Sequence, residues 1–145
     1  MEKTQKHCTL IEGRIRLRVR YAEVDQMGVV HHSRYAVYFE MGRTELLRAN
    51  GYEYRDLEAA GVLLAVTRLE VRFKAPARYD DELEIFTRIV KIDHVRIEHE
   101  YRLSRVGDGR LLAEAATTLV HIDRAGKLQP IPDFLKPGET SGQVS

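Results

Sequence analysis

The stretch SRYAVYFEMGRTELLRANG, residues 33–51, predicts one long amphipathic helix. Its apolar and small residues recur at intervals of three and four, so a helix places them along a single stripe. The stripe consists of Tyr35, Tyr38, Phe39, Gly42, Leu46 and Ala49. Asn50-Gly51 is a helix stop signal. Because glycine is unfavourable inside a helix, Gly42 in the middle of the stripe predicts a close approach to another backbone.

The segments on both sides of this helix alternate with the period of two that is typical of β-strands. Before the helix, residues 15–21 alternate between apolar side chains and arginines. After it, a short second helix is predicted over residues 53–60. Further strands are predicted at residues 62–73, 83–89, 95–103 and 111–122. The first of these changes phase near its middle, which predicts a β-bulge.

The order of these elements predicts an α+β fold: a strand, a long helix, then four strands. The Asp-Gly pair within residues 106–110 predicts a tight hairpin, and residues 111–122 are apolar at both parities, as in a central strand. We expect a single domain over residues 1–145, with a core at about 13–135 and short polar tails at both ends. One helix leaves the edges of such a sheet exposed, so a dimer or higher assembly is expected.

The composition argues against several classes of protein. With 23 basic and 22 acidic side chains the formal charge is +1, which gives no support for a nucleic-acid or membrane-surface partner. No apolar run approaches the roughly 18 residues of a membrane span, and the N-terminal MEKTQKHCTL has no signal core. The one cysteine, Cys8, lies in a polar lead-in and cannot form an intrachain disulfide. A cytoplasmic protein is the default expectation.

The loop before the helix carries Asp25, Gly28 and two adjacent histidines. A helix that begins near Ser33 presents unpaired N–H groups and the positive end of its dipole. A carbonyl oxygen placed there would be polarised as charge develops on it, which is the geometry of an oxyanion site. Asp25 could then reach the carbonyl carbon directly or through a water. This pairing favours acyl transfer, and a carboxylate that only caps a turn is the plain alternative.

Other chemistries find less support in the sequence. There is no G-x-S-x-G motif, and Cys8 lies in a predicted tail, so a serine or cysteine nucleophile is not indicated. Adjacent histidines such as His31 and His32 usually point in divergent directions and chelate poorly, and His94 and His99 lack the spacing of metal ligands. No glycine loop for phosphate is present. No metal is therefore expected.

Residues 18–51, RVRYAEVDQMGVVHHSRYAVYFEMGRTELLRANG, resemble the 4-hydroxybenzoyl-CoA thioesterase family of hotdog-fold acyl-CoA thioesterases, in particular its YbgC-like branch. The shared pattern is R-x-x-x-x-D-x-x-G-x-V-x-H-x-x-Y-x-x-x-x-E-x-x-R. It is matched by Arg20, Asp25, Gly28, Val30, His32, Tyr35, Glu40 and Arg43. VRFKAPARYDDELEIFTRI, residues 71–89, resembles the family's Pro-Ala-x-Tyr-x-Asp segment. The similarity spans roughly residues 13–135.

The resemblance implies catalytic roles for two residues. Asp25 matches the family's catalytic carboxylate, which is described either as a nucleophile on the thioester or as the base that activates water. His32 matches the position whose backbone N–H polarises the thioester carbonyl. His31 and Arg34 stand where the family often has Tyr and Asn, which affects the expected substrate preference rather than the chemistry.

The resemblance also implies the architecture and the partners. The fold would be an antiparallel five-stranded sheet wrapped around one long helix, in a homodimer or homotetramer with active sites at the dimer interface. The substrate would be an acyl-CoA, and no cofactor is implied beyond the coenzyme A of the substrate. Candidate substrate contacts are Gly28, Val30, His31, Tyr35, Arg72 and Lys74. Tyr35 also belongs to the helix stripe, and a solvated strand edge is the alternative for Arg72 and Lys74.

Several alternatives stay open at this point. Acyl carrier protein could replace coenzyme A as the thioester donor, because the motif does not contact that part of the substrate. A non-catalytic hotdog module that binds acyl-CoA is a second alternative, although regulators of that kind need a DNA-binding segment for which the lead-in is too short. The hydratase branch of the fold places a histidine five residues after the aspartate, where this chain has Val30.

Overall fold

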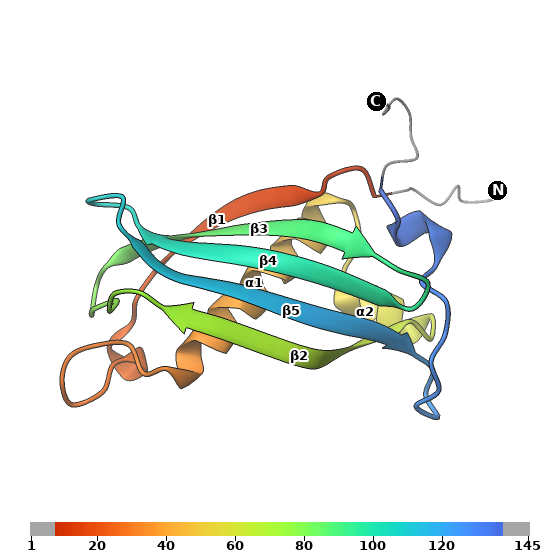
Figure 1. Cartoon of the computed structure of the whole chain (residues 1–145), viewed down its shortest axis with the longest axis horizontal. Coiled ribbons are helices and arrows are strands. Elements are labelled where there is room, and N and C mark those ends of the chain that lie inside the picture. The colour runs from red at the N-terminus through yellow and green to blue at the C-terminus, as the bar shows by residue number, and fades with distance from the viewer. Residues whose placement is uncertain (1–7, 138–145) are drawn as a thin grey trace.

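The computed structural model describes residues 8–137 of the chain. In this part, one sheet lies across the long helix α1, with the shorter elements at the ends of the sheet (Figure 1). The elements in chain order are β1 Glu12–Arg18, η1 Tyr21–Glu23, α1 Ser33–Ala49, α2 Tyr54–Ala59, β2 Leu63–Phe73, β3 Glu82–Ile92, β4 Arg96–Arg105, β5 Leu111–Ile122 and η2 Asp133–Leu135. The class is α+β, as the sequence predicts.

The sheet has five strands in the order β1-β3-β4-β5-β2, and every neighbouring pair is antiparallel. The chain forms one edge with β1, crosses a face of the sheet as α1, and forms the opposite edge with β2 (Figure 1). The register of β2 against β5 shifts between Val66 and Arg68, which confirms the predicted bulge. Both edges leave unpaired backbone groups in a single chain.

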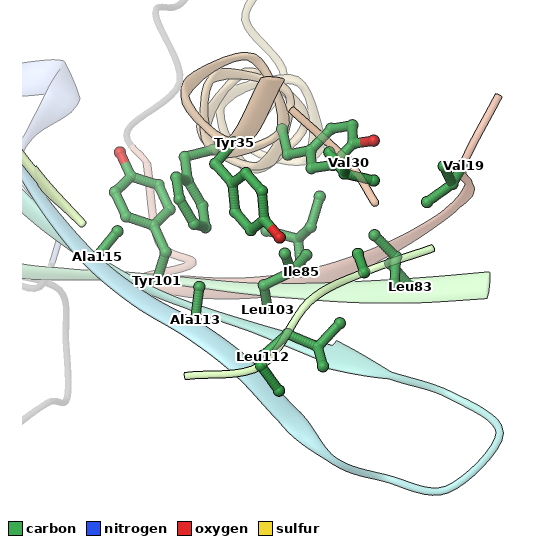
Figure 2. Packing of buried hydrophobic residues seen from close by; sticks show 14 residues of the cluster. Val19, Val30, Tyr35, Leu83, Ile85, Tyr101, Leu103, Leu112, Ala113 and Ala115 are labelled. Carbon is green, nitrogen blue, oxygen red and sulfur yellow. The ribbon is translucent and has the colours of Figure 1, made fainter. Parts of the chain in front are cut away.

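The core lies between α1 and the sheet (Figure 2). The predicted stripe of α1 is buried from Tyr35 to Leu46, whereas Ala49 at its end is exposed. The ring of Phe39 packs on that of Tyr101 in β4, with 5.0 Å between centroids. The sheet contributes Leu83, Ile85, Leu103, Leu112, Ala113 and Ala115 to the same cluster. Full burial of a large apolar side chain contributes roughly 1.5–3 kcal/mol, so this contact fixes the helix on the sheet.

Gly42 marks the closest approach of α1 to the sheet. A Cβ added at this position would overlap the hydroxyl of Thr87 in β3 and lie 3.0 Å from Cγ2 of Ile85. A close approach is therefore present, but the prediction of another backbone is wrong: the neighbouring atoms belong to side chains of β3. Only a residue without a side chain lets α1 lie at this depth.

The N-terminus of α1 is capped by a histidine side chain. His32 already has helical dihedral angles, φ −57° and ψ −27°, so His31 is the residue that flanks the helix. Nδ1 of His31 accepts a hydrogen bond from the Ser33 N–H at 3.2 Å and lies 2.9 Å from the Ser33 hydroxyl. This is the bond that a capping side chain makes to the second residue of a helix. It requires Nδ1 of His31 to be unprotonated.

Two segments differ from their predictions. The first strand covers residues 12–18 rather than 15–21, because Val19 pairs with the loop at Asp80 and Asp81 and the chain then turns into η1. The prediction that Cys8 lies in a tail is wrong: it is 3% exposed and packs in a second cluster under α2 and η2. Burial raises the pKa of the Cys8 thiol to about 11, which leaves it a poor nucleophile.

A histidine is buried on the inner face of β4. His99 stacks on Tyr101 with 6.0 Å between ring centroids, and its Nδ1 has no hydrogen-bond partner within residues 8–137. Burial, assisted by the nearby positive charge of Arg43, lowers the pKa of His99 to about 3. The imidazole is therefore neutral in the folded protein at neutral pH.

We predict that Gly42→Ala destabilises the fold in spite of alanine's better helix propensity. Insertion of a methyl group into a packed contact costs about 1–3 kcal/mol, against roughly 1 kcal/mol gained in propensity. Chemical denaturation should show a net loss for Gly42→Ala and a smaller loss when it is combined with Thr87→Ala. Gly13→Ala is the matched control, because its Cβ would meet only Cδ1 of Leu46 at 3.5 Å. A Gly42→Ala protein as stable as wild type would contradict the close packing.

For the cap, His31→Ala should cost about 0.5–2 kcal/mol of stability, the usual range for a lost N-cap side chain. His31→Asn should restore most of this, because asparagine offers an acceptor to the Ser33 N–H. Thermal unfolding of the three proteins at neutral pH is the measurement. Equal losses for alanine and asparagine would show that the ring does not act as a cap.

We predict that His99 makes the stability of the fold depend on pH. An unfolded His99 would take up a proton near pH 6.5, whereas the folded one resists protonation down to about pH 3. Its contribution to stability is thus complete above pH 6.5 and is lost as the pH falls toward 3, by about 2 kcal/mol between pH 7 and pH 5. Urea titrations of wild type and His99→Gln should reveal a shallower pH dependence in the variant. The exposed His94, changed to Gln, is the control; parallel curves for wild type and His99→Gln would refute the assignment.

Candidate active site

Residues 23–31, between β1 and α1, form a loop that folds back on itself as a short antiparallel ladder. We call this segment the 23–31 loop. The Asp25 N–H donates to the Val29 carbonyl at 2.8 Å, and the His31 N–H donates to the Glu23 carbonyl at 2.9 Å. Val24 and Val30 form an isolated β-bridge between these two bonds. The ladder therefore holds Asp25 on one strand and the start of α1 on the other.

A second contact fixes this loop to the chain that follows β2. The Val30 N–H donates to the Ala77 carbonyl at 2.8 Å, and Val29 bridges to Arg78. The backbone of Ala77 also forms a hydrogen bond with the Tyr35 hydroxyl. Residues 29–31 are thus paired on both sides, to residues 23–25 and to residues 77–78.

The carboxylate of Asp25 organises its own turn. Oδ1 accepts hydrogen bonds from the N–H of Met27 at 2.8 Å and, more weakly, of Val29 at 3.4 Å. Gly28 donates to the Asp25 carbonyl at 3.0 Å and has φ +80°, a left-handed conformation that glycine adopts without strain. Oδ2 has no hydrogen-bond partner within residues 8–137, and the side chain is partly exposed. Asp25 therefore makes the hydrogen bonds expected of a carboxylate that caps a turn, and its second oxygen remains available.

The backbone N–H of His32, directly before α1, is also available within residues 8–137. Ser33 donates its N–H to Nδ1 of His31, and Arg34 donates to the His31 carbonyl at 2.9 Å. The His32 N–H has no acceptor in the described chain, although the residue is already helical. Since this N–H lies at the positive end of the helix dipole, it is suited to bind a carbonyl oxygen on which negative charge develops.

A shallow pocket of about 300 Å³ opens beside this N–H. Its lining residues are Val30, His32, Tyr35, Phe73, Lys74, Ala75 and Pro76. The buried ring of Tyr35 meets that of Phe73 edge to face, with 4.9 Å between centroids. Burial raises the pKa of Tyr35, so its hydroxyl stays protonated. The pocket is mostly apolar, which suits an acyl group next to the helix N-terminus.

Arg105, the last residue of β4, holds Pro76 in the wall of this pocket. Its Nη2 donates to the Pro76 carbonyl at 2.8 Å, its Nε to Asp81 at 3.0 Å and its Nη1 to Asp108 at 2.9 Å. These bonds raise the pKa of the guanidinium, which stays charged throughout. The β4–β5 hairpin thereby stiffens the segment that carries Ala77.

The structure brings only some of the predicted substrate contacts together. Val30 and Tyr35 line the pocket with His32, and Lys74 lies at its rim. Gly28 shapes the turn at Asp25, and His31 is engaged as the helix cap. The remaining candidate, Arg72, borders a hollow on the outer face of the sheet and contacts Glu70 at 3.9 Å. Asp25 itself does not line the pocket of the single chain.

Within residues 8–137, no group of three or more histidine, cysteine, aspartate or glutamate side chains is arranged to hold a metal ion. None of the helices in this part of the chain has the length and apolarity needed to cross a membrane. The candidate functional groups in this part of the chain are Oδ2 of Asp25, the N–H of His32 and the apolar pocket.

Sequence reasoning missed three residues that support these groups: Glu23, Ala77 and Arg105. Glu23 stands three residues after Arg20, the separation at which a short turn brings two side chains together, and this spacing was visible in the sequence. Ala77 acts through its backbone and Arg105 through contacts distant in the chain. Those two carry no local signal.

Comparison with known proteins places this arrangement in a family. The family model described as the thioesterase-like superfamily matches residues 19–137. The acyl-CoA thioester hydrolase YbgC of Escherichia coli is 36% identical over 107 residues, which cover 74% of this chain and 79% of that protein. The chloroplastic acyl-acyl carrier protein thioesterase ATL2 of Arabidopsis thaliana is 32% identical over 122 residues, which cover 84% of this chain and 65% of that protein.

Solved structures agree with the sequence comparison. The DHNA-CoA thioesterase from Staphylococcus aureus superposes with a TM-score of 0.77 at 30% identity, over 84% of this chain and 80% of that one. The sheet and helix described above are thus the hotdog fold. The chain belongs to the thioesterase-like superfamily.

Proposed function

We propose that this protein hydrolyses acyl-CoA thioesters to a free carboxylic acid and coenzyme A. The observation that carries the proposal is the His32 N–H, which lacks an acceptor within residues 8–137 and belongs to a residue that lines an apolar pocket. The similarity to YbgC supports the acyl-CoA substrate class. No cofactor beyond the coenzyme A of the substrate is needed, because a carboxylate and a polarised carbonyl suffice for hydrolysis.

In the proposed reaction the thioester carbonyl oxygen accepts the His32 N–H, and the acyl group enters the pocket beside Tyr35. Oδ2 of Asp25 takes a proton from water as the water oxygen adds to the carbonyl carbon. The resulting oxyanion is stabilised by the His32 N–H and the dipole of α1. The carbon–sulfur bond then breaks, and the sulfur takes the proton that Asp25 held, so coenzyme A leaves as the thiol. In the alternative, the Asp25 carboxylate attacks the carbonyl carbon and displaces the coenzyme A thiolate to form a mixed anhydride. Water then hydrolyses this anhydride to the free acid and Asp25, and the thiolate takes a proton from that water.

The substrate class is tested by a hydrolysis panel with thiol release as the readout. Aromatic, short and long acyl groups are offered on coenzyme A, and one of them also on acyl carrier protein. The proposal expects turnover of at least one acyl-CoA with a kcat/KM above that of the same acyl group on the carrier protein. Turnover on acyl carrier protein alone would assign the chain to the donor named for ATL2, and binding without turnover would indicate a non-catalytic module.

The chemical step makes a sharp prediction for Asp25→Asn. The variant keeps the acceptor for Met27 and loses the charge, so folding should be unaffected. Turnover should fall by roughly 10² to 10⁴, the range for a lost general base, and KM should change little because the lost interaction belongs to the transition state. Circular dichroism and sizing control for misfolding. A well-folded variant with near-normal kcat would show that Asp25 only shapes its turn.

We further propose that the active unit is a dimer, either alone or as half of a tetramer. The edge strand β2 exposes Val66, Leu69 and Phe73 by about half, and Val37 and Met41 of α1 are exposed as well. Edge-to-edge pairing of two β2 strands would satisfy their backbone groups and cover these side chains. Since Phe73 also lines the pocket, the partner would lie next to the site.

The assembly prediction is read out by light scattering. Wild type should give at least twice the 16.7 kDa mass of one chain at micromolar concentration. Leu69→Lys should lower the mass and the activity together, whereas Leu128→Lys, on an exposed residue outside β2, should change neither. A fully active monomer, in wild type or variant, would rule the proposal out.

A further inference from the structure

Glu23 is an unusual residue in this structure, because it is a buried carboxylate. It is 6% exposed, and it is the only acidic side chain among the buried residues of the described part of the chain. A buried charge is costly unless it is paired and hydrogen-bonded. Glu23 therefore requires donors that satisfy both of its oxygens.

Four hydrogen bonds satisfy the two oxygens of Glu23. Oε1 accepts the backbone N–H of Arg20 at 2.9 Å and the hydroxyl of Tyr38 at 2.9 Å. Oε2 accepts Nε of Arg20 at 3.2 Å and Nη2 at 3.0 Å. Burial alone would raise the pKa of Glu23, but these donors outweigh it and hold the pKa below its usual value. The carboxylate is thus ionised at neutral pH.

The bond to Tyr38 connects the 23–31 loop with the long helix. Tyr38 is 1% exposed, lies in the core stripe of α1 and sits one turn after Tyr35 of the pocket. Burial and the neighbouring carboxylate both raise the pKa of Tyr38, so its hydroxyl remains a donor. Without this bond, residues 23–25 would be held by the ladder to residues 29–31 and by the packing of Val24 against the core, with no side-chain hydrogen bond to α1 within residues 8–137.

The two catalytic groups therefore have different supports. His32 directly precedes the first residue of α1, and residues 29–31 are fixed through the Val30 N–H to the Ala77 carbonyl. Asp25 lies two residues after Glu23 on the other strand of the ladder, and Glu23 is the described residue of this strand whose side chain forms a hydrogen bond with α1. Displacement of that strand would move Asp25 relative to the His32 N–H and leave the acyl pocket in place.

We infer that Glu23 is a positioning residue, which sets the distance between Asp25 and the His32 N–H by anchoring the Asp25 strand to Tyr38 of α1. The inference rests on the proposed function, since it assigns Asp25 as the group that is positioned. It assigns Glu23 no contact with substrate. Misplacement of a reacting group by about 1 Å can cost on the order of 10² in rate, so the effect should be measurable.

The test is a double-mutant cycle of Glu23→Gln with Asp25→Asn, measured on the fastest acyl-CoA of the panel. Glu23→Gln alone should lower kcat by roughly 10- to 100-fold with KM within about twofold of wild type. In the Asp25→Asn background the same change should lower the residual kcat by no more than about twofold, because there is no carboxylate left to misplace. Independent, multiplicative losses would overturn the inference.

Further variants separate positioning from a general loss of stability. Tyr38→Phe keeps the carboxylate and removes its donor on α1, so it should lower kcat at constant KM even if Glu23→Gln does not fold. Glu84→Gln is the matched control, because Glu84 pairs with Arg14 and Arg16 on β1, outside the site. All kinetics are run at least 15 °C below the measured Tm of each variant.

The outcomes distinguish this inference from the proposed function. A near-normal kcat in Asp25→Asn would contradict the proposed function itself. A slow Asp25→Asn beside wild-type kcat in both Glu23→Gln and Tyr38→Phe would contradict only the positioning role. A loss expressed in KM instead of kcat would also overturn it, because it would place Glu23 in substrate binding.

Discussion

The contact of Gly42 on α1 with Thr87 and Ile85 on β3 sets how closely the helix lies on the sheet. That depth decides where the N-terminus of α1 emerges, and hence where the His32 N–H lies relative to the residues at the end of β2. A helix held even slightly farther out would carry Tyr35 away from Phe73 and open the pocket between them. The proposed chemistry thus depends on a packing contact in the middle of the helix, far along the chain from Asp25.

The second constraint is the pairing of three short segments at the helix start. Residues 29–31 lie between residues 23–25 and residues 77–78, and each junction is a backbone contact. Side chains anchor the two outer segments: Glu23 to Tyr38 on one side, and Arg105 to Pro76 on the other. Both anchors are charged groups whose hydrogen bonds are satisfied, so the loop gains a defined geometry from polar contacts at the border of an apolar core.

The fold could be predicted from the sequence because its signals are local. The stripe of α1, the bulge in β2 and the hairpin after β4 each follow from periodicity or turn residues. The position of Cys8 could not be predicted, because its polar neighbours conceal contacts with Ile131 and Leu135 more than a hundred residues away. The first strand ended early for the same reason, since Val19 pairs with a distant loop.

The candidate site was predictable in part. Asp25, Gly28 and the helix start stand together in the sequence, and among residues 8–137 neither Oδ2 of Asp25 nor the His32 N–H has a hydrogen-bond partner. The cap made by His31 could not be foreseen, because it depends on which way the ring turns. The supporting residues Ala77 and Arg105 are distant from Asp25 in the sequence and become neighbours only when the sheet forms.

The most direct test of the account is the amide resonance of His32 in ¹⁵N-labelled protein. Two unreactive ligands are compared: an acyl-CoA analogue that keeps the carbonyl but has a methylene group before the sulfur, and an alkyl-CoA thioether without a carbonyl. The account predicts a downfield shift of the His32 amide proton with the ketone only, while the amides of Ser33 and Arg34, which already have acceptors, move little. A His32 resonance that both ligands leave unchanged, or shift equally, would contradict the claim that this N–H binds the carbonyl oxygen.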